Sequence, residues 1–521
     1  MRVGILDILT DVRLTGTLSR VYAAYFRKQF VSIGPQAVSV WCRELGHDVT
    51  YATYYGQQDP RSLLPRDLDI VFIAAHTPSA LLAYALAKVF RREKVRTVLG
   101  GPHAKSFPED ALRFFDIVVT GCDRASIADI LDGHVDPPAI LSQTRPLTEI
   151  PTVAERRPEI EASAFIRGKP GLSTIVPMLT SIGCPYSCNF CVDWNNSYIA
   201  LPKEQITEDL RYVAEQFPRA VIGYHDPNFA VRFDETMDII ESVPEGRRNG
   251  YVMESSLSIL KESRLARLRE TNCVYVAPGI EAWADYSNKS GTVGMAGRDK
   301  LERIIDHLRL LADFVPGIQV NIMVGTETDR GDEPVALTKE FIRRVPEVWP
   351  TINIPTPFGG TPLYETYLAE GRVLQRMPFA FYYNPYLAIR LKHYTALAYY
   401  DHLIDIQETL ASKTMLVRRL RTRQRRAIRF IHSLRTHRGR RALESLRRIR
   451  TQLATDPHVR AFHEGDSDSL PAFYHRELER RLGLYAQLLD RAERTPVFAR
   501  PARPDAVADG RTEPTAIRAV G

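Results

Sequence analysis

The sequence contains little cysteine and no apolar run that suits a membrane span. Six cysteines among 521 residues are too few for a disulfide scaffold, so the fold must depend on an apolar core. The longest apolar stretch, Ile70–Phe90, is interrupted by a histidine, a proline and a lysine, which predicts a strand, a turn and a helix. The first ten residues lead directly into Asp11 and Arg13 and do not resemble a secretion signal, so we expect a cytoplasmic protein.

Composition is typical of globular proteins. Hydrophobic residues make up 44% and charged residues 25% of the chain, which excludes whole-chain disorder and fibrous repeats. At about 100–200 residues per domain, the length predicts two or three domains. A tail over 491–521, rich in proline, small residues and charge, is expected to be disordered.

Positive charge is concentrated in one segment. The net charge is +7, but residues 413–450 contain 15 Lys and Arg and a single acid, Glu444, so this segment carries +14 and the remainder −7. Apolar residues recur there near helical spacing, which predicts an amphipathic basic helix: Val417, Leu420, Ala427, Ile431 and Leu434. Three interpretations stay open, namely peripheral contact with an anionic membrane, binding of nucleic acid, and packing of the apolar stripe on the protein itself.

Residues 1–135 alternate between short apolar runs and helical patterns. This alternation predicts a doubly wound parallel sheet, with strands at Val3–Leu9, Val49–Tyr55, Ile70–Ala75, Thr97–Leu99 and Ile117–Thr120. Ligands of such sheets bind beyond the carboxyl ends of the strands, so segments 76–79, 100–104 and 121–123 are expected to line a crevice. No G-x-G-x-x-G follows the first strand, which speaks against a nicotinamide or flavin domain.

The most specific motif is C-x3-C-x2-C, formed by Cys184, Cys188 and Cys191. Three thiolates on one short loop suit three irons of a cubic iron–sulfur cluster and leave the fourth iron free for a small chelating molecule. Zinc is the alternative, because a distant fourth ligand would complete a tetrahedral site.

This motif, with Phe190 just before its last cysteine, resembles the signature of the radical S-adenosylmethionine (SAM) superfamily. One expected strand, at 172–182, leads into the cysteine loop, and five more follow it, at 220–224, 250–253, 274–280, 318–324 and 351–354, with helical patterns between them. They predict an open (β/α)6 barrel over 172–375, preceded by a linker over 136–171 and followed by a helical region over 376–490.

Polar motifs at these strand ends are also similar to those of the superfamily. They include D-P-N-F at 226–229, G-I-E at 279–281, N-I-M-V-G at 321–325 and the proline-rich turn at 355–364. The resemblance implies contacts with SAM by Phe190, Asp226, Asn228, Glu254, Ser256, Glu281 and Gly325. A carboxylate at a strand end also suits a purely structural role as a helix cap.

The resemblance extends to a cobalamin-binding domain before the barrel, through Val98–Ala104 and Phe115–Gly121. It implies cobalamin contacts by Thr77, Ser79, Gly100, Gly101, His103 and Gly121. Two departures are visible. No D-x-H-x-x-G follows the first strand, so a bound cobalamin would lack the usual lower-face histidine, and the acidic G-E-G-E turn is replaced by residues 121–124, G-C-D-R.

Together these resemblances imply a radical SAM enzyme that holds a 4Fe-4S cluster and cobalamin. It would cleave SAM reductively to a 5′-deoxyadenosyl radical and methylate a carbon of a small or lipid-like molecule, with an electron donor such as flavodoxin or ferredoxin. The alternatives are a radical cyclisation or rearrangement, an RNA-modifying iron–sulfur enzyme, and a non-catalytic iron–sulfur protein. The cobalamin-like first domain speaks against the RNA enzymes, so nucleic acid is not an expected partner.

Overall fold

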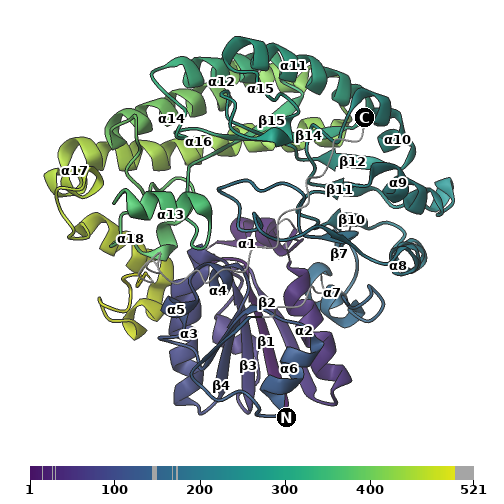
Figure 1. Cartoon of the computed structure of the whole chain (residues 1–521), viewed down its shortest axis with the longest axis vertical. Helices are drawn as coiled ribbons and strands as arrows, with labels where there is room; N and C mark the ends of the chain where they lie inside the picture. Colours follow the sequence, from purple (N-terminus) through teal and green to yellow (C-terminus); the bar gives the residue numbers. More distant parts are fainter. Residues whose placement is uncertain are drawn as a thin grey trace, which may run out of the picture.

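A computed structural model describes residues 1–14, 16–25, 27–29, 31–142, 149–166, 168–171 and 174–498. Two parallel sheets, each with its own helices, and a C-terminal group of helices make up the molecule (Figure 1). The C-terminal helices run from the second sheet back to the first, so the chain closes on itself (Figure 1). The predicted α/β class with a helical C-terminal region is confirmed.

The first sheet has six parallel strands in the order β2-β1-β3-β4-β5-β6. Their bounds are β1 (Arg2–Ile8), β2 (Asp48–Tyr54), β3 (Ile70–Ala75), β4 (Arg96–Gly100), β5 (Ile117–Gly121) and β6 (Ala139–Ser142). The sixth strand lies where a linker was predicted. It is only four residues long and half-exposed, which gives too weak an apolar pattern to be recognised in the sequence.

Helices cover both faces of the first sheet, because its strand side chains alternate between the faces. Ile5 and Phe72 pack toward α2 and α6, whereas Leu6 and Ile73 pack toward α3. The bounds are α1 (Thr17–Tyr25), α2 (Ile33–Glu44), α3 (Ala80–Arg92), α4 (Pro102–Ser106), α5 (Pro108–Ala111) and α6 (Arg124–Leu131). β1 pairs with β2 on one side and β3 on the other, so the strand order reverses there and a crevice is expected at these carboxyl ends.

The second sheet is an open barrel of parallel strands in the order β7-β10-β11-β12-β14, with β13 and β15 also paired to β14. Its strands are β7 (Ile175–Met178), β10 (Val221–Tyr224), β11 (Tyr251–Met253), β12 (Cys273–Val276), β13 (Gly279–Glu281), β14 (Gly317–Met323) and β15 (Val348–Asn353). β8 (Ser181–Ile182) and β9 (Ile199–Ala200) form a separate antiparallel pair. Residues 172–173 of the first expected barrel strand lie outside the described residues. The single strand expected at 274–280 is divided in two at Pro278, which has no backbone N–H for the ladder.

Helices connect these strands and continue to the C-terminus. They are α7 (Arg157–Ala164), α8 (Lys203–Gln216), α9 (Phe233–Glu241), α10 (Leu265–Glu270), α11 (Gly297–Phe314), α12 (Glu333–Arg344), α13 (Pro362–Ala369), α14 (Ala396–Leu410), α15 (Lys413–Leu420), α16 (Arg426–Thr455), α17 (Pro457–Glu464) and α18 (Ala472–Leu482). Among the described residues, no helix combines the length and the apolar character needed to cross a bilayer.

The basic segment forms two helices, α15 and α16, where one was predicted. Of the expected apolar stripe, Val417 and Leu420 are 44% and 49% exposed, whereas Ile431 and Leu434 are half-buried. The first half of α16 instead buries His432, Thr436 and Gly439. Small residues are needed on this face because α14 lies so close that a Cβ at Gly439 would approach the side chain of Gln407 at 2.8 Å.

The C-terminal helices close onto the first sheet through buried and half-buried polar contacts. Arg481 of α18 forms a buried ion pair with Asp11 at 2.6 Å, and Glu493 pairs with Lys88 of α3 at 2.7 Å. The backbone N–H of Val497 donates to Asp110 at 2.6 Å. The expected disorder from residue 491 onward is therefore wrong for residues 491–498, and the remainder of the expected tail lies outside the described residues.

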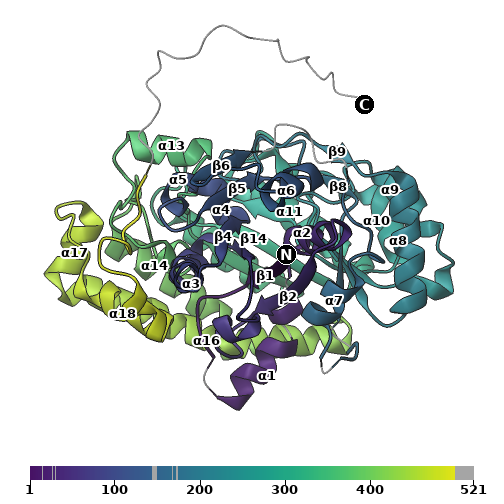
Figure 2. The ribbon, with the colours of Figure 1, turned by 90° about the horizontal axis from the view of Figure 1, so that it is seen from below.

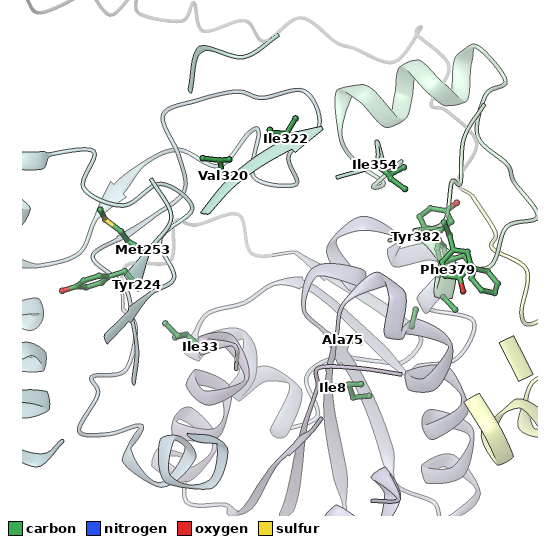
Figure 3. Packing of buried hydrophobic residues seen from close by; sticks show 14 of the residues in the cluster. Ile8, Ile33, Ala75, Tyr224, Met253, Val320, Ile322, Ile354, Phe379 and Tyr382 are labelled. Carbon is green, nitrogen blue, oxygen red and sulfur yellow. The ribbon is translucent and has the colours of Figure 1, made fainter. Parts of the chain in front are cut away.

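A continuous apolar core joins these parts. It includes Ile8 and Ala75 of the first sheet, Val320 and Ile322 of β14, and the aromatic turn around Phe379 (Figure 3). Figure 2 shows the first sheet and its helices lying across the second sheet, with the C-terminal helices beside both. The carboxyl ends of the two sheets are thereby brought together.

Candidate cofactor and active site

The cysteine loop begins where the chain leaves β7. β8 and β9 pair antiparallel through Ser181 with Ala200 and Ile182 with Ile199, and close residues 183–198 into a loop. Gly183, with φ of +70°, directly precedes Cys184. A Cβ at this position would collide with the carbonyl oxygen of Ser197, so only glycine fits the start of the loop.

Asp226, at the end of β10, fixes the same start of the loop. Its buried Oδ1 accepts hydrogen bonds from the hydroxyls of Thr180 and Ser181, each at 2.6 Å. The N–H of Thr180 lies 3.1 Å from both carboxylate oxygens. Burial raises the pKa of Asp226, and these hydrogen bonds partly offset the rise. In its described contacts Asp226 therefore positions the cysteine loop, a task that the resemblance did not imply.

The three thiols lie close to one another and to a cation. Burial raises the pKa of each thiol, and nearby Lys289 opposes the rise in all three. The N–H of Asp193 donates to Cys191 Sγ at 3.4 Å, and Ser287 Oγ lies 3.7 Å from Cys188 Sγ. Among described residues, no three His, Cys, Asp or Glu converge as ligands of one ion. A cubic cluster does not need such convergence, because each cysteine binds a different iron.

Neighbouring strand ends hold the cysteine loop through side-chain contacts. Tyr186 Oη lies 2.6 Å from Ser258 Oγ, which donates to the hydroxyl of Ser256 at 2.9 Å beyond β11. Phe190 stacks on Tyr286, with ring centroids 5.7 Å apart and an interplanar angle of 9°. Phe190 and Ser256 thus belong to the wall around the loop.

Three other residues predicted to contact SAM are Asn228, Glu254 and Glu281, and each has a polar group suited to bind a ligand. The Nδ2 of Asn228 is buried and has no partner among the described residues, a rare state that a bound acceptor would relieve. Glu254 is exposed to water, yet burial by the surrounding protein raises the pKa of its carboxyl. Burial raises the pKa of Glu281 to about 7, against the opposing charge of Lys289.

Glu281 and Lys289 are held in defined places. Glu281 has a φ of +67°, a strained value for a residue with a side chain. Its carboxylate folds back over Gly279, where any Cβ would collide with it. Burial lowers the pKa of Lys289, but the negative charges of Cys188, Cys184 and Glu281 outweigh this effect and raise it.

Gly325 lies just beyond the carboxyl end of β14, at a turn whose backbone conformation favours glycine. Its φ is +91°, and a Cβ would approach the ring of Tyr399 at 2.7 Å. The N–H groups of Gly325 and Thr326 both donate to Asp329 Oδ2, at 2.8 and 3.0 Å. The N–H of Gly325 is therefore occupied within the protein.

The carboxyl edge of the first sheet contains an apolar cavity of about 300 Å³. Gly100, Gly101 and Gly121, all predicted to bind cobalamin, line it together with α2 and α6 residues. A Cβ at Gly100 would meet nothing within 4 Å, so the glycine leaves open space toward the cavity. Val192 and Asp193, directly after Cys191, form another part of the wall. The cavity and the cysteine loop are thus contiguous.

The other three predicted cobalamin residues lie elsewhere. Thr77, Ser79 and His103 are at most 3% exposed and are absent from the cavity lining. His103 Nε2 lies 2.6 Å from Tyr84 Oη, and its ring packs 4.9 Å from that of Phe379. The aromatic turn of the C-terminal region covers this part of the sheet, a contact that the sequence pattern did not predict.

Comparison with known proteins agrees with this geometry. The family model of the radical SAM superfamily matches residues 178–337, which include the cysteine loop and the barrel up to α12. These residues form a radical SAM domain. Such a domain uses a 4Fe-4S cluster and SAM, and the matched residues include Cys184, Cys188 and Cys191.

Relatives of the whole arrangement are also known. The chain is 24% identical over 369 residues to the bacteriochlorophyllide d C-8(2)-methyltransferase of Chlorobaculum tepidum, covering 68% of this chain and 80% of that protein. It is 24% identical over 414 residues to the hopanoid C-3 methylase of Methylococcus capsulatus, covering 74% and 77%.

A solved structure shares the fold outside the radical SAM domain as well. The cobalamin-dependent SAM radical enzyme OxsB, with aqua-cobalamin bound, has a TM-score of 0.56 at 13% identity, covering 94% of this chain and 79% of that one. The radical SAM methyltransferase TsrM from Kitasatospora setae has a TM-score of 0.50 at 12% identity, covering 72% and 76%. The likeness shows that the three parts of this chain form a known architecture.

Sequence reasoning missed Lys289, Tyr186 and Tyr286 of the radical SAM domain. Lys289 had a weak signal, since it is the one cation between Glu281 and Gly297 in the sequence. The two tyrosines had none, because an aromatic residue in a loop is as readily explained by packing.

Proposed function

We propose that this protein is a cobalamin-dependent radical SAM methyltransferase that acts on a carbon of a small or lipid-like molecule. The observation that carries the proposal is the shared wall between the first-sheet cavity and the cysteine loop. Val192 and Asp193 belong to both, and Asp193 pairs with Lys105 of α4 at 3.2 Å. A group held in the cavity is therefore next to the loop that holds the cluster.

The cavity fits the nucleotide end of cobalamin. Its lining is almost entirely aliphatic and glycine-rich, which suits a flat heteroaromatic group whose burial excludes water. The residues that line it include no histidine, so the protein offers no imidazole to the cobalt from this wall. Bound there, the cofactor supplies a transferable methyl group.

The residues of the radical SAM domain have separate tasks in this proposal. The three cysteines hold the cluster, which supplies an electron and one open iron for the amino and carboxylate groups of SAM. Glu254 and Glu281 accept hydrogen bonds from the SAM amino group and ribose, and Asn228 donates its unpaired N–H. Asp226 keeps the cysteine loop in place, and Lys289 balances the negative charge of the thiolates.

The proposal extends to the substrate, the electron donor and the location of the protein. The named relatives are a bacteriochlorophyllide methyltransferase and a hopanoid methylase, which favours a small or lipid-like substrate here. Flavodoxin or ferredoxin is the expected electron donor, and the protein works in the cytoplasm, where a reduced donor is available.

Anaerobic reconstitution of the full chain tests the proposal. Metal analysis should give about four irons and one cobalt per chain. Turnover with SAM carrying a deuterated methyl group should give a trideuterated product, together with S-adenosylhomocysteine and 5′-deoxyadenosine. Deoxyadenosine without methyl transfer would indicate a radical cyclase or rearrangement enzyme instead, and zinc without iron would exclude the proposal altogether.

A further inference from the structure

The turn between α15 and α16 concentrates positive charge. Residues 417–430, which we name the arginine corner, contain seven arginines and no acid. The chain leaves α15 at Leu420, turns through 421–425 and enters α16 at Arg426. A tight turn between two helices thereby gathers charges that a single straight helix would distribute around its axis.

Alternate residues of the turn point in opposite directions. Gln424 donates to the carbonyl oxygens of Pro316 and Glu347, at 2.9 and 2.8 Å, and Thr422 is buried and donates to Arg419. Arg421, Arg423 and Arg425 are exposed. The inward residues fix the turn to the barrel, so the outward arginines are presented by a rigid backbone.

The two ends of the same basic segment differ in how their charge is balanced. Near the C-terminus of α16, Arg447 pairs with Glu408 at 2.6 Å and Arg450 with Asp401 at 2.8 Å. Within the described part of the chain, no ion pair is formed by the outward arginines of the corner, namely Arg418, Arg421, Arg423, Arg425, Arg426 and Arg429. No acidic side chain among the described residues therefore balances their charge.

Apolar side chains are exposed among these arginines. Val417 is 44%, Leu420 49% and Phe430 67% exposed. Exposed apolar residues interleaved with cations are typical of surfaces that insert side chains between lipid headgroups. Nucleic acid favours aromatic platforms for stacking, and two of these three residues are aliphatic.

The arginine corner lies at the end of the barrel that faces away from the cysteines. Pro316 and Glu347, which it contacts, precede β14 and β15, whereas the cysteine loop follows the carboxyl end of β7. Figure 1 shows α15 on the side of β15 that faces away from the first sheet. A partner bound at the corner therefore leaves the site open.

We propose that the arginine corner docks the protein on an anionic lipid bilayer. Arg421, Arg423 and Arg425 contact lipid phosphates, and Leu420 and Phe430 enter the headgroup layer. The inference concerns a surface and does not depend on the reaction that the site performs.

Co-sedimentation of the full chain with vesicles tests this proposal. Binding should be seen with phosphatidylcholine containing about 30% phosphatidylglycerol, should be weak with phosphatidylcholine alone, and should fall as salt is raised. Replacement of the three turn arginines by glutamine (R421Q, R423Q, R425Q) should weaken binding at least about tenfold, since each basic residue near such a surface contributes about 1 kcal/mol. L420S with F430S should also weaken it.

The matched control is R447Q with R450Q, which removes two arginines of the same helix whose charge is already balanced. This variant should bind vesicles as the unaltered chain does. F430W should show a blue-shifted emission on addition of anionic vesicles, a readout that does not depend on loss of binding. Inorganic phosphate should compete no better than chloride of equal ionic strength, since a single ion cannot span the surface.

Three results would overturn the proposal: equal binding to neutral and anionic vesicles, unchanged binding by the triple variant, or an equal loss in the R447Q/R450Q control. Tighter binding of a single-stranded RNA than of vesicles at the same salt, lost in the triple variant, would assign the corner to nucleic acid instead. Far-ultraviolet circular dichroism and the melting temperature confirm that each variant is folded.

Discussion

The two parallel sheets meet at their carboxyl ends, and these ends differ in chemistry. The edge of the first sheet is lined by glycine and aliphatic side chains around a cavity of about 300 Å³. The edge of the second sheet carries three thiols, Glu254, Glu281 and Lys289. Both candidate sites agree with the rule that ligands of parallel sheets bind at the carboxyl ends of the strands.

The difference shows what topology decides and what it leaves to side chains. Strand order determines where a ligand binds, and the residues that follow each strand determine which ligand it is. An apolar cavity selects a group by shape and by exclusion of water, whereas thiols and carboxylates select by coordination and charge. The shared wall at Val192 and Asp193 is where the two kinds of recognition meet.

The largest expected effect is loss of the iron–sulfur cluster. It tests whether only the thiols at the edge of the second sheet are needed for iron binding. Cys184→Ala should abolish cluster assembly, because two thiolates remain for three irons. Iron content and the visible absorption of the reconstituted chain measure this directly. Cys122→Ala removes the same group from the cavity wall of the first sheet and should keep full iron; loss of iron there would break the distinction between the two edges.

A bulky side chain in the first-sheet cavity tests whether cobalamin binding can be lost while iron binding is kept. Gly100→Leu fills open space without collision, since a Cβ there meets nothing within 4 Å, so folding should be retained. Cobalamin affinity should fall at least about 100-fold because the cavity is the size of one ring system, while iron content stays unchanged. Cobalt and iron analysis of the same sample gives both answers, and retained cobalt would show that cobalamin binds outside this cavity.

Much of the fold follows from periodicity in the sequence. The strands of both sheets were predicted because each buried strand is a short, nearly continuous apolar run. β6 was missed because it is short and half-exposed, and the division at Pro278 was missed because the apolar pattern continues through it. The sequence pattern left open which face of α16 is buried, and in its first half this face carries His432, Thr436 and Gly439.

The site was less predictable than the fold. The cysteine spacing is the most specific signal in the sequence, because three thiols within eight residues suit three irons of one cluster. Asp226 was placed in the right region with a different contact, because the sequence cannot tell whether a strand-end carboxylate faces a ligand or the neighbouring loop. His103 was expected in the crevice but is covered by Phe379, 276 residues further along the chain, a separation over which no local pattern extends.

Asp7 is the exception to the apolar character of the first sheet. It lies one residue before the end of β1, is buried, and accepts a hydrogen bond from the N–H of Ser32 at 3.2 Å. Burial raises its pKa from 3.8 to about 7, so the folded state binds this proton more tightly than the unfolded state. Its ionisation therefore costs stability progressively between about pH 4 and 7, and the cost is complete above pH 7.

Asp7→Asn should remove this pH dependence. At pH 8 the variant should be more stable than the unaltered chain by about 4 kcal/mol, whereas at pH 4 the two should be similar. Urea unfolding of the cofactor-free chain at both pH values measures the difference. A variant that is less stable at pH 8 would show that the ionised carboxylate is stabilised in the fold by contacts beyond Ser32.

The smallest expected effect concerns Glu281 at the second edge. If its carboxylate accepts hydrogen bonds from the SAM amino group, Glu281→Gln should weaken SAM binding about tenfold, the usual difference between a charge-assisted and a neutral hydrogen bond. Anaerobic calorimetry on the cluster-loaded protein measures the affinity, and iron content should be unchanged. The control is Glu262→Gln, an exposed acid of the same domain. An equal affinity in both variants would remove Glu281 from the SAM contacts and leave Glu254 and Asn228 to bind the cosubstrate.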